Sequence, residues 1–328
     1  PALPRLRFRV PDREGLPPLK SYASLESHSG RRVVGYTEAS RGCKHHCRHC
    51  PVVPVYEGKF RIVQQEVVLA DIRQQVEAGA GHITFGDPDF FNGIGHVMPL
   101  VEALHQEYPW LTYDVTIKIE HIIKNAALIP ELEQTGCLFI TSAVESVDNR
   151  ILALLDKNHT AEDFERAVKM LQASDIAFAP TFVAFTPWIT LEGYLALLER
   201  LVELELVENV SPIQLAIRLL IPKGSYLLNL PGFKDLIDDF DPNLLGYPWR
   251  HRDPRVDALQ VAVQESIEDS EANDCSRREA FTRVWELVHR TLHVHAAELP
   301  ISLGEPIPRH SEPWYCCAEP TNRQLQVV

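Results

Sequence analysis

The chain has no uninterrupted stretch of 18 apolar residues, and its first 20 residues contain no hydrophobic signal-peptide core. We therefore expect neither a membrane-spanning helix nor a secretory leader. Positive charge is also scarce, because 45 acidic residues outweigh 32 basic ones and give a net charge of −13. Lysine and arginine contacts to phosphate supply most nucleic-acid affinity, so this balance disfavours DNA or RNA as a partner.

Cysteine is infrequent and unevenly distributed. Of the seven cysteines, three lie together at Cys43, Cys47 and Cys50. An odd total of this kind does not resemble a disulfide framework, and we expect the reducing cytoplasm as the location. The remaining four do not have the tight spacing of a second iron–sulfur site: Cys137, Cys275, Cys316 and Cys317.

The three clustered cysteines have the spacing C-x3-C-x2-C. Thiolates this close can hold three irons of a 4Fe–4S cluster and leave the fourth iron without a protein ligand. Such an iron is able to bind a small molecule, whereas a cluster with four protein ligands mainly passes electrons. The alternative is a zinc site in which an interspersed histidine completes a Cys3His set: His45, His46 or His49.

Strand-like and helix-like patterns alternate from residue 33 onward. The strand-like segments are residues 33–38, 82–85, 113–118, 137–141, 177–183 and 213–220. Helices are expected at residues 67–78, 97–108 and 122–134, after an N-cap at Thr160, and along 191–202. Repeated strand–helix units with right-handed crossovers predict an α/β fold with a parallel sheet.

The pattern changes after the last predicted strand. Residues 231–255 are rich in proline and aspartate and predict a linker. Ser276 and Glu279 have the spacing of a capping box, which predicts the start of another helix. We therefore divide the chain into an N-terminal basic arm (1–32), a core (33–235), and a third part with linker, helical extension and tail (236–328).

The cysteine motif, together with the strand–helix pattern that follows it, resembles the radical SAM superfamily. The resemblance implies a partial (β/α)6 TIM-like barrel, one 4Fe–4S cluster on Cys43, Cys47 and Cys50, and S-adenosylmethionine (SAM) on the open iron. It also implies cleavage of SAM to methionine and a 5′-deoxyadenosyl radical, with electrons from a flavodoxin- or ferredoxin-type reductant. The superfamily usually has an aromatic residue at the position of His49, whose flat ring is able to lie against adenine.

Two further segments carry the resemblance. Gly86 and Asp87 follow the second predicted strand, where superfamily members have a GGE segment that binds the amino group of SAM. Glu145 and Ser146 follow the fourth predicted strand, in a run that resembles a G-x-E-S signature. The resemblance implies that these four residues contact SAM. From the residues alone, the Glu145 carboxylate also fits a cap on the next helix.

Polar residues in two predicted strands are candidates for substrate contact. Lys118 and Glu120 alternate with apolar residues, so in a strand they share one face. If that face is the barrel interior, they line the cavity above SAM; against the helices, burial of their charges is costly. Arg218 lies in an otherwise apolar run, where a buried guanidinium needs a carboxylate or phosphate partner. We expect a small-molecule substrate.

The end of the chain contains Cys316-Cys317-Ala318-Glu319-Pro320. This segment resembles the tail of the CUAEP/CCAEP-tail radical SAM proteins, some of which carry selenocysteine. The resemblance implies that Cys316 and Cys317 act in catalysis, because selenium in relatives indicates redox or soft-ligand chemistry. By composition alone, the same cysteines fit a loose peptide in a reducing compartment.

Several functions are compatible with these features. The leading hypothesis is a radical SAM enzyme in which Cys316 or Cys317 quenches or captures a product radical. A second enzyme hypothesis has the paired cysteines bind arsenic or selenium, which receives a carbon group from SAM. The hypotheses outside catalysis are an iron–sulfur electron-transfer protein and a zinc-stabilised binding domain.

Overall fold

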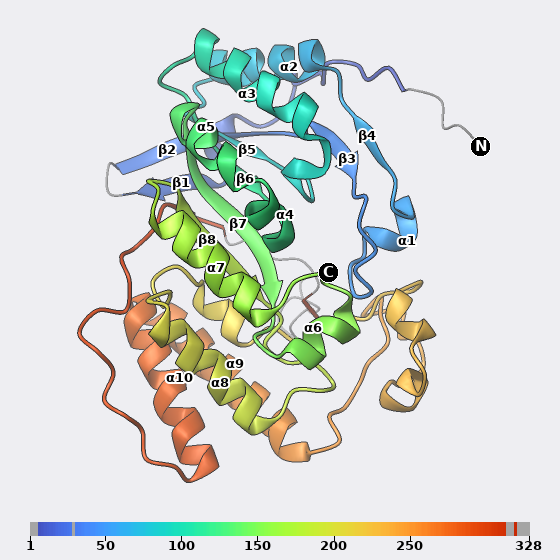
Figure 1. The fold of residues 1–328 in the computed structure, drawn as a ribbon, viewed down its shortest axis with the longest axis vertical. Helices are drawn as coiled ribbons and strands as arrows, with labels where there is room; N and C mark the ends of the chain where they lie inside the picture. The colour runs from blue at the N-terminus through green and yellow to red at the C-terminus, as the bar shows by residue number, and fades with distance from the viewer. Residues whose placement is uncertain (1–5, 28–29, 313–317, 320–328) are drawn as a thin grey trace.

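The computed structural model describes residues 6–27, 30–312 and 318–319. Its centre is a seven-stranded sheet in the order β8-β7-β6-β5-β2-β1-β9. Five neighbouring strands are parallel: β2 (Gly30–Thr37), β5 (His82–Phe85), β6 (Thr112–Thr116), β7 (Cys137–Glu145) and β8 (Ala177–Phe182). The sheet curls into a half-barrel (Figure 1), which confirms the predicted α/β partial barrel.

Helices between the strands pack against this sheet (Figure 1). Thr160 caps α7 as predicted, in a capping box with Asp163. The helices are α2 (Gln65–Glu77), α3 (Ile94–Glu107), α4 (Ile119–Lys124), α5 (Ile129–Gln134), α6 (Asn149–Leu155), α7 (Ala161–Gln172) and α8 (Leu191–Glu203). Short 3₁₀ turns lie at Leu19–Ser21, Phe90–Gly93, Ala126–Leu128, Pro212–Leu215, Tyr226–Asn229 and Phe233–Leu236.

Two predicted elements are wrong in detail. The single helix expected at residues 122–134 is divided into α4 and α5, because Pro130 cannot continue a helix and instead lies in the first turn of α5. The sixth strand expected at 213–220 is a 3₁₀ turn followed by a parallel bridge between Arg218 and Phe185. Pro212 has no backbone N–H to donate to a longer ladder. The short bridge still continues the sheet beyond β8.

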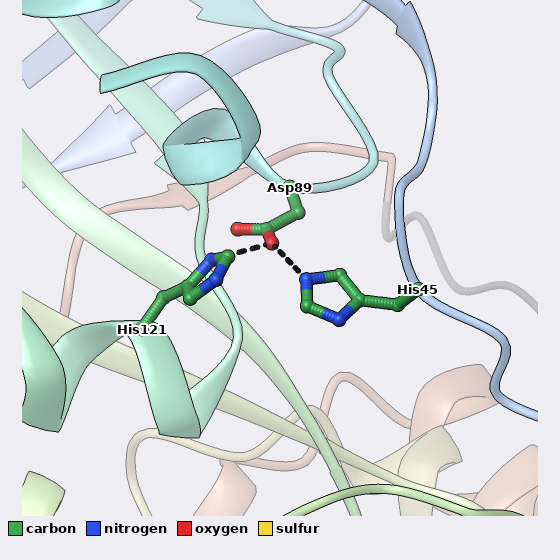
Figure 2. Close-up of side chains that lie close together, drawn as sticks. All are labelled: His45, Asp89 and His121. Carbon is green, nitrogen blue, oxygen red and sulfur yellow. Dashed lines mark hydrogen bonds and ion pairs between the residues drawn. The ribbon is translucent and has the colours of Figure 1, made fainter. Parts of the chain in front are cut away.

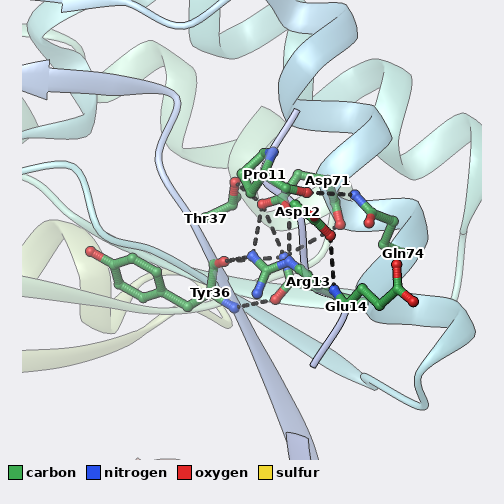
Figure 3. Close-up of polar contacts among 9 residues, drawn as sticks. Pro11, Asp12, Arg13, Glu14, Tyr36, Thr37, Asp71 and Gln74 are labelled. Carbon is green, nitrogen blue, oxygen red and sulfur yellow. Dashed lines mark hydrogen bonds and ion pairs between the residues drawn. The ribbon is translucent and has the colours of Figure 1, made fainter. Parts of the chain in front are cut away.

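Segments from both ends of the chain join the core sheet. β1 (Ser24–Ser27) pairs antiparallel with β2, and β9 (Arg309–His310) pairs antiparallel with β1. The N-terminal arm is held by Arg13, which donates to both oxygens of Asp71 at 2.7 and 2.9 Å and to Tyr36 O (Figure 3). Asp71 is buried and also accepts from Thr37, so this ion pair fixes the arm over β2 and α2.

The C-terminal extension consists of α9 (Pro254–Ala272) and α10 (Arg277–Leu292), which pack on each other, and α10 also packs on α8. Ser276 forms the predicted capping box with Glu279 at the start of α10. The buried face of α10 includes Phe281, Val284 and Val288. None of the helices in the described ranges is long and apolar enough to cross a bilayer.

Candidate functional site

The cysteine loop lies between β3 (Ser40–Gly42) and β4 (Phe60–Ile62), which form a separate antiparallel pair, and it contains the short helix α1 (Val53–Tyr56). Cys43 and Cys47 are buried free thiols, and Cys50 is half-buried. Gly42 precedes them at φ +87°, and a Cβ there would meet Lys59 O and the Tyr56 ring. The turn into the loop therefore requires glycine.

Arg48 ties the cysteine loop to two distant segments. Its side chain donates to the carbonyls of Ala153 and Leu154 at the end of α6, at 3.1 and 3.0 Å. Its carbonyl accepts from Ser225 Oγ at 2.9 Å and from the Leu227 N–H. The loop is thus held by protein contacts that do not involve its thiols.

Asp87 fixes the strand that leads into the loop. Its oxygens accept from the Ala39 N–H at 2.8 Å and from Ser40 Oγ at 2.6 Å. Burial raises the pKa of the Asp87 carboxyl to about 7, against the opposing effect of these hydrogen bonds. Gly86 lies directly under Tyr36, whose ring occupies the space that a Cβ would need. Contact of Gly86 and Asp87 with SAM stays a prediction.

The donor chemistry of the loop fits a cubane cluster better than a Cys3His zinc site. The interspersed histidines face other partners: His45 contacts Asp89, His46 stacks on Tyr226, and His49 contacts Glu145. A tetrahedral zinc needs four donors within one small sphere. In the part of the chain that the structure describes, no group of donors converging within 4.8 Å contains a cysteine. Three separated thiols on one loop suit three corners of a 4Fe–4S cluster.

Glu145 is the centre of a buried polar network beside the loop. It ends β7 in the left-handed region at φ 69°, and its Oε1 lies 3.0 Å from His49 Nε2 and 3.2 Å from Lys157 Nζ. Burial alone raises the pKa of this carboxyl, but Lys157 and His49 outweigh it and lower the pKa to about 2. Ser146 is also buried, and its Oγ accepts from the Asp148 N–H at the start of α6. The ionised Glu145 therefore joins β7, the cysteine loop and Lys157.

Several buried polar atoms near this network have no hydrogen-bond partner among the described residues. They include His49 Nδ1, Asn92 Nδ2 and both ring nitrogens of His159. Burial and Lys157 lower the pKa of His159 to about 4, so the ring is neutral near pH 7. Asn92 Oδ1 lies 3.9 Å from Cys43 Sγ. Buried polar atoms usually have partners, so these groups fit a polar ligand beside the cysteine loop.

Lys118 and Glu120 are not strand residues, which corrects the alternation argument. β6 ends at Thr116, Lys118 is the N-cap of α4, and Glu120 lies in its first turn. The N–H groups of His121 and Ile122 already bond Lys118 O, so the backbone there is helical. Lys118 Nζ pairs with Glu120 Oε1 at 2.6 Å, and that oxygen lies 3.2 Å from His45 Nδ1. Both charges therefore still lie beside the cysteine loop.

Arg218 binds the tail of the chain. Its Nε lies 2.9 Å from Glu319 Oε2 and its Nη1 donates to Asp257 Oδ1 at 2.7 Å. The guanidinium also bonds Trp249 O and stacks 3.6 Å above the Trp249 ring. Ala318 bridges Leu219 antiparallel, and the Glu319 N–H donates to Arg218 O. Cys316 and Cys317 themselves lie outside the described residues.

His45, Asp89 and His121 form a compact group that was not predicted from the sequence (Figure 2). His45 is on the cysteine loop, Asp89 follows β5, and His121 is on α4 after β6. Position after a strand of a parallel sheet was an available signal for Asp89 and His121. From the sequence, His45 was a candidate only as a zinc ligand together with the cysteines.

A model of the radical SAM superfamily matches residues 37–193, just under half of the chain. The chain is 25% identical over 160 residues to the tRNA-2-methylthio-N(6)-dimethylallyladenosine synthase of Chlorobium chlorochromatii (strain CaD3), covering 47% of this chain and 35% of that protein. It is 25% identical over 149 residues to the hopanoid C-3 methylase of Methylococcus capsulatus (strain ATCC 33009 / NCIMB 11132 / Bath), covering 44% and 28%. The chain thus spans about a third of the length of these curated relatives.

Among solved structures, the fold is similar to that of the cobalamin-dependent S-adenosylmethionine radical enzyme OxsB with aqua-cobalamin bound. The TM-score is 0.60 at 18% identity, over 72% of this chain and 41% of that one. This likeness shows the fold. The segment that matches the superfamily model contains the whole cysteine loop, and the half-barrel fold is shared with OxsB.

Proposed function

We propose that this protein is a radical SAM enzyme that cleaves SAM reductively and acts on a small molecule. The observation that carries the proposal is the loop with Cys43, Cys47 and Cys50, held by Arg48 against α6 at the end of the half-barrel where β7 terminates. A 4Fe–4S cluster on these thiolates supplies the electron that converts SAM to methionine and a 5′-deoxyadenosyl radical. The net charge of −13 favours a small molecule over a nucleic acid.

The residues around the loop provide the polar contacts that such chemistry requires. We propose that SAM lies against Gly86, Asp87, His49, Glu145 and Ser146. In support, His49 Nδ1 and Asn92 Nδ2 are buried without partners among the described residues, so both have hydrogen-bonding capacity to offer. Glu120 contacts His45 and pairs with Lys118, and these two residues are our candidates for contact with the substrate.

We further propose that the tail belongs to the CCAEP type and that Cys316 or Cys317 donates a hydrogen atom to a substrate radical. The support is the position of the next two residues. Ala318 and Glu319 pair with residues 218–219, and the same segment reaches the cysteine loop at Ser225 and Leu227. The tail and the loop therefore contact one short stretch of chain. A thiol must be at van der Waals contact with a carbon radical to react.

The reaction class is tested by SAM cleavage. Anaerobically reconstituted protein with SAM and dithionite, or with a reduced flavodoxin, is expected to form 5′-deoxyadenosine, measured by mass spectrometry. An electron-transfer protein or a zinc domain gives none. Reduced, fully loaded protein that binds SAM but forms neither 5′-deoxyadenosine nor another SAM cleavage product contradicts the proposal.

The position of the tail is tested by Glu319→Gln. Burial raises the pKa of Glu319 to about 7, against the opposing effect of Arg218, so the measurement belongs at about pH 8, where the carboxylate is ionised. Neutralising it removes a charge-assisted contact, and hydrogen exchange of the residue-319 amide is expected to become about tenfold faster. The matched control is Glu312→Gln, at an exposed position in the same segment. Equal exchange in the two variants contradicts the docked position.

A further inference from the structure

His45, Asp89 and His121 bring three metal-binding atoms together beside the cysteine loop (Figure 2). Asp89 Oδ2 lies 3.1 Å from His45 Nε2 and 2.7 Å from His121 Nδ1. The Asp89 side chain is 0% exposed, that of His45 is 11% exposed and that of His121 is 7% exposed. His45 is on the cysteine loop, Asp89 lies between β5 and the 3₁₀ turn at Phe90–Gly93, and His121 is on α4, so three separate segments converge on this point.

The contact between His121 and Asp89 is not an ordinary hydrogen bond. The two atoms are only 2.7 Å apart, yet His121 Nδ1 makes no well-aligned hydrogen bond within the described residues. A buried nitrogen without a partner is costly. A cation in front of both atoms explains the arrangement. Ligand atoms about 2.1 Å from one ion, at angles of about 80–110°, lie about 2.7–3.4 Å apart.

The surroundings of the group match those of metal-binding histidines. The second nitrogen of His45, Nδ1, lies 3.2 Å from Glu120 Oε1, and Lys118 Nζ neutralises that carboxylate at 2.6 Å. Asp89 Oδ1 accepts from the Lys118 N–H at 3.4 Å. Histidine ligands commonly donate their other nitrogen to a carboxylate, which orients the ring and sets its tautomer. His45 and Asp89 therefore both have supporting contacts.

A second group of the same composition provides a contrast. His82, Asp114 and His310 also converge, but there every contact is a hydrogen bond. Asp114 Oδ1 accepts from His82, His310 and Thr84, and His82 Nδ1 bonds Thr112. Hydrogen bonding alone explains that group. Hydrogen bonding does not explain the position of His121 Nδ1, which lies close to Asp89 Oδ2 without a well-aligned hydrogen bond.

We propose that His45 Nε2, Asp89 Oδ2 and His121 Nδ1 bind one divalent transition-metal ion, separate from the iron–sulfur cluster. Two imidazoles and one carboxylate suit Mn²⁺, Fe²⁺ or Zn²⁺, and not the all-oxygen preference of Ca²⁺ or Mg²⁺. Three protein ligands leave coordination positions for water or for an oxygen of the substrate. Since His45 lies between Cys43 and Cys47 in the sequence, the ion holds a substrate next to the cluster loop.

Mn²⁺ titration of the full-length, cluster-loaded protein tests the site. With the cluster oxidised and EPR-silent, the signal of free Mn²⁺ reports how much ion is bound. One bound Mn²⁺ per chain, displaced by Zn²⁺, is expected. His121→Gln and Asp89→Asn are expected to weaken binding at least tenfold, and Glu120→Gln by about 10-fold or more through loss of orientation of His45. None of these readouts depends on catalysis.

His310→Gln is the matched control, because it alters the other histidine–aspartate group. Its Mn²⁺ affinity is expected to equal that of the wild type. Iron content and circular dichroism identify any variant that has lost its fold. If His121→Gln or Asp89→Asn has done so, Glu120→Gln, on the surface of α4, is the variant that tests the metal site. Absence of bound Mn²⁺ and Zn²⁺ in the wild type overturns the proposal. So does equal affinity in wild type, His121→Gln and Glu120→Gln, or a loss of binding in His310→Gln.

Discussion

Replacing Cys43, Cys47 and Cys50 together by alanine is expected to reduce bound iron from about four per chain to none and to abolish formation of 5′-deoxyadenosine. The reason is that no other described cysteine is close enough to replace the triad: Cys137 is buried in β7 and Cys275 follows α9. The half-barrel should remain folded, because Arg48, Asp87 and Ser225 hold the loop without using its thiols.

Iron and sulfide analysis after anaerobic reconstitution measures the first effect, and circular dichroism checks the fold. Cys275→Ala serves as the matched control, since it removes a thiol outside the loop and should leave iron content unchanged. Full iron loading of the triple variant would contradict the assignment of the cluster to this loop.

Replacing Cys317 by alanine is expected to separate SAM cleavage from product formation. The variant should bind the cluster and SAM and still form some 5′-deoxyadenosine, but the normal product should be lost because the thiol that donates hydrogen is missing. The physical basis is the docking of the next residue: Ala318 pairs with Leu219, and Glu319 binds Arg218. The tail is thus joined to the same segment that contacts the cysteine loop.

A comparison of wild-type and Cys317→Ala protein by untargeted metabolite analysis, with 5′-deoxyadenosine measured in parallel, provides the test. Cys275→Ala is again the control, and it should give the normal product. Wild-type turnover by a chain truncated before Trp314 would show that the tail has no part in catalysis.

Local sequence patterns predicted much of the architecture. The parallel strands β2, β5, β6, β7 and β8 lie where apolar runs indicated them, because a strand buried on both faces needs continuous apolar residues. The helix starts at Thr160 and Ser276 were also predictable, since an N-cap depends on residues only three positions apart.

Errors arose where a tertiary contact or a single proline decided the local structure. Lys118 and Glu120 have the alternation of a strand, but β6 ends at Thr116 and α4 begins at Ile119. The run at 213–220 is apolar enough for a strand, yet it forms a 3₁₀ turn and one bridge to Phe185. The two-residue strand β9 has no local signal, because it exists only through its pairing with β1.

The amino-acid sequence by itself indicated a metal centre on the cysteine loop, because three thiols within eight residues can bind one, and it left a 4Fe–4S cluster and a Cys3His zinc site as alternatives. Only the tertiary structure decided which distant groups surround that loop. Glu145 meets His49 across 96 residues, and Asp89 meets both His45 and His121. Arg218 meets Glu319 at the other end of the chain. These contacts depend on how the strands curl and where each strand ends. Charged residues that are far apart in the sequence reveal neither.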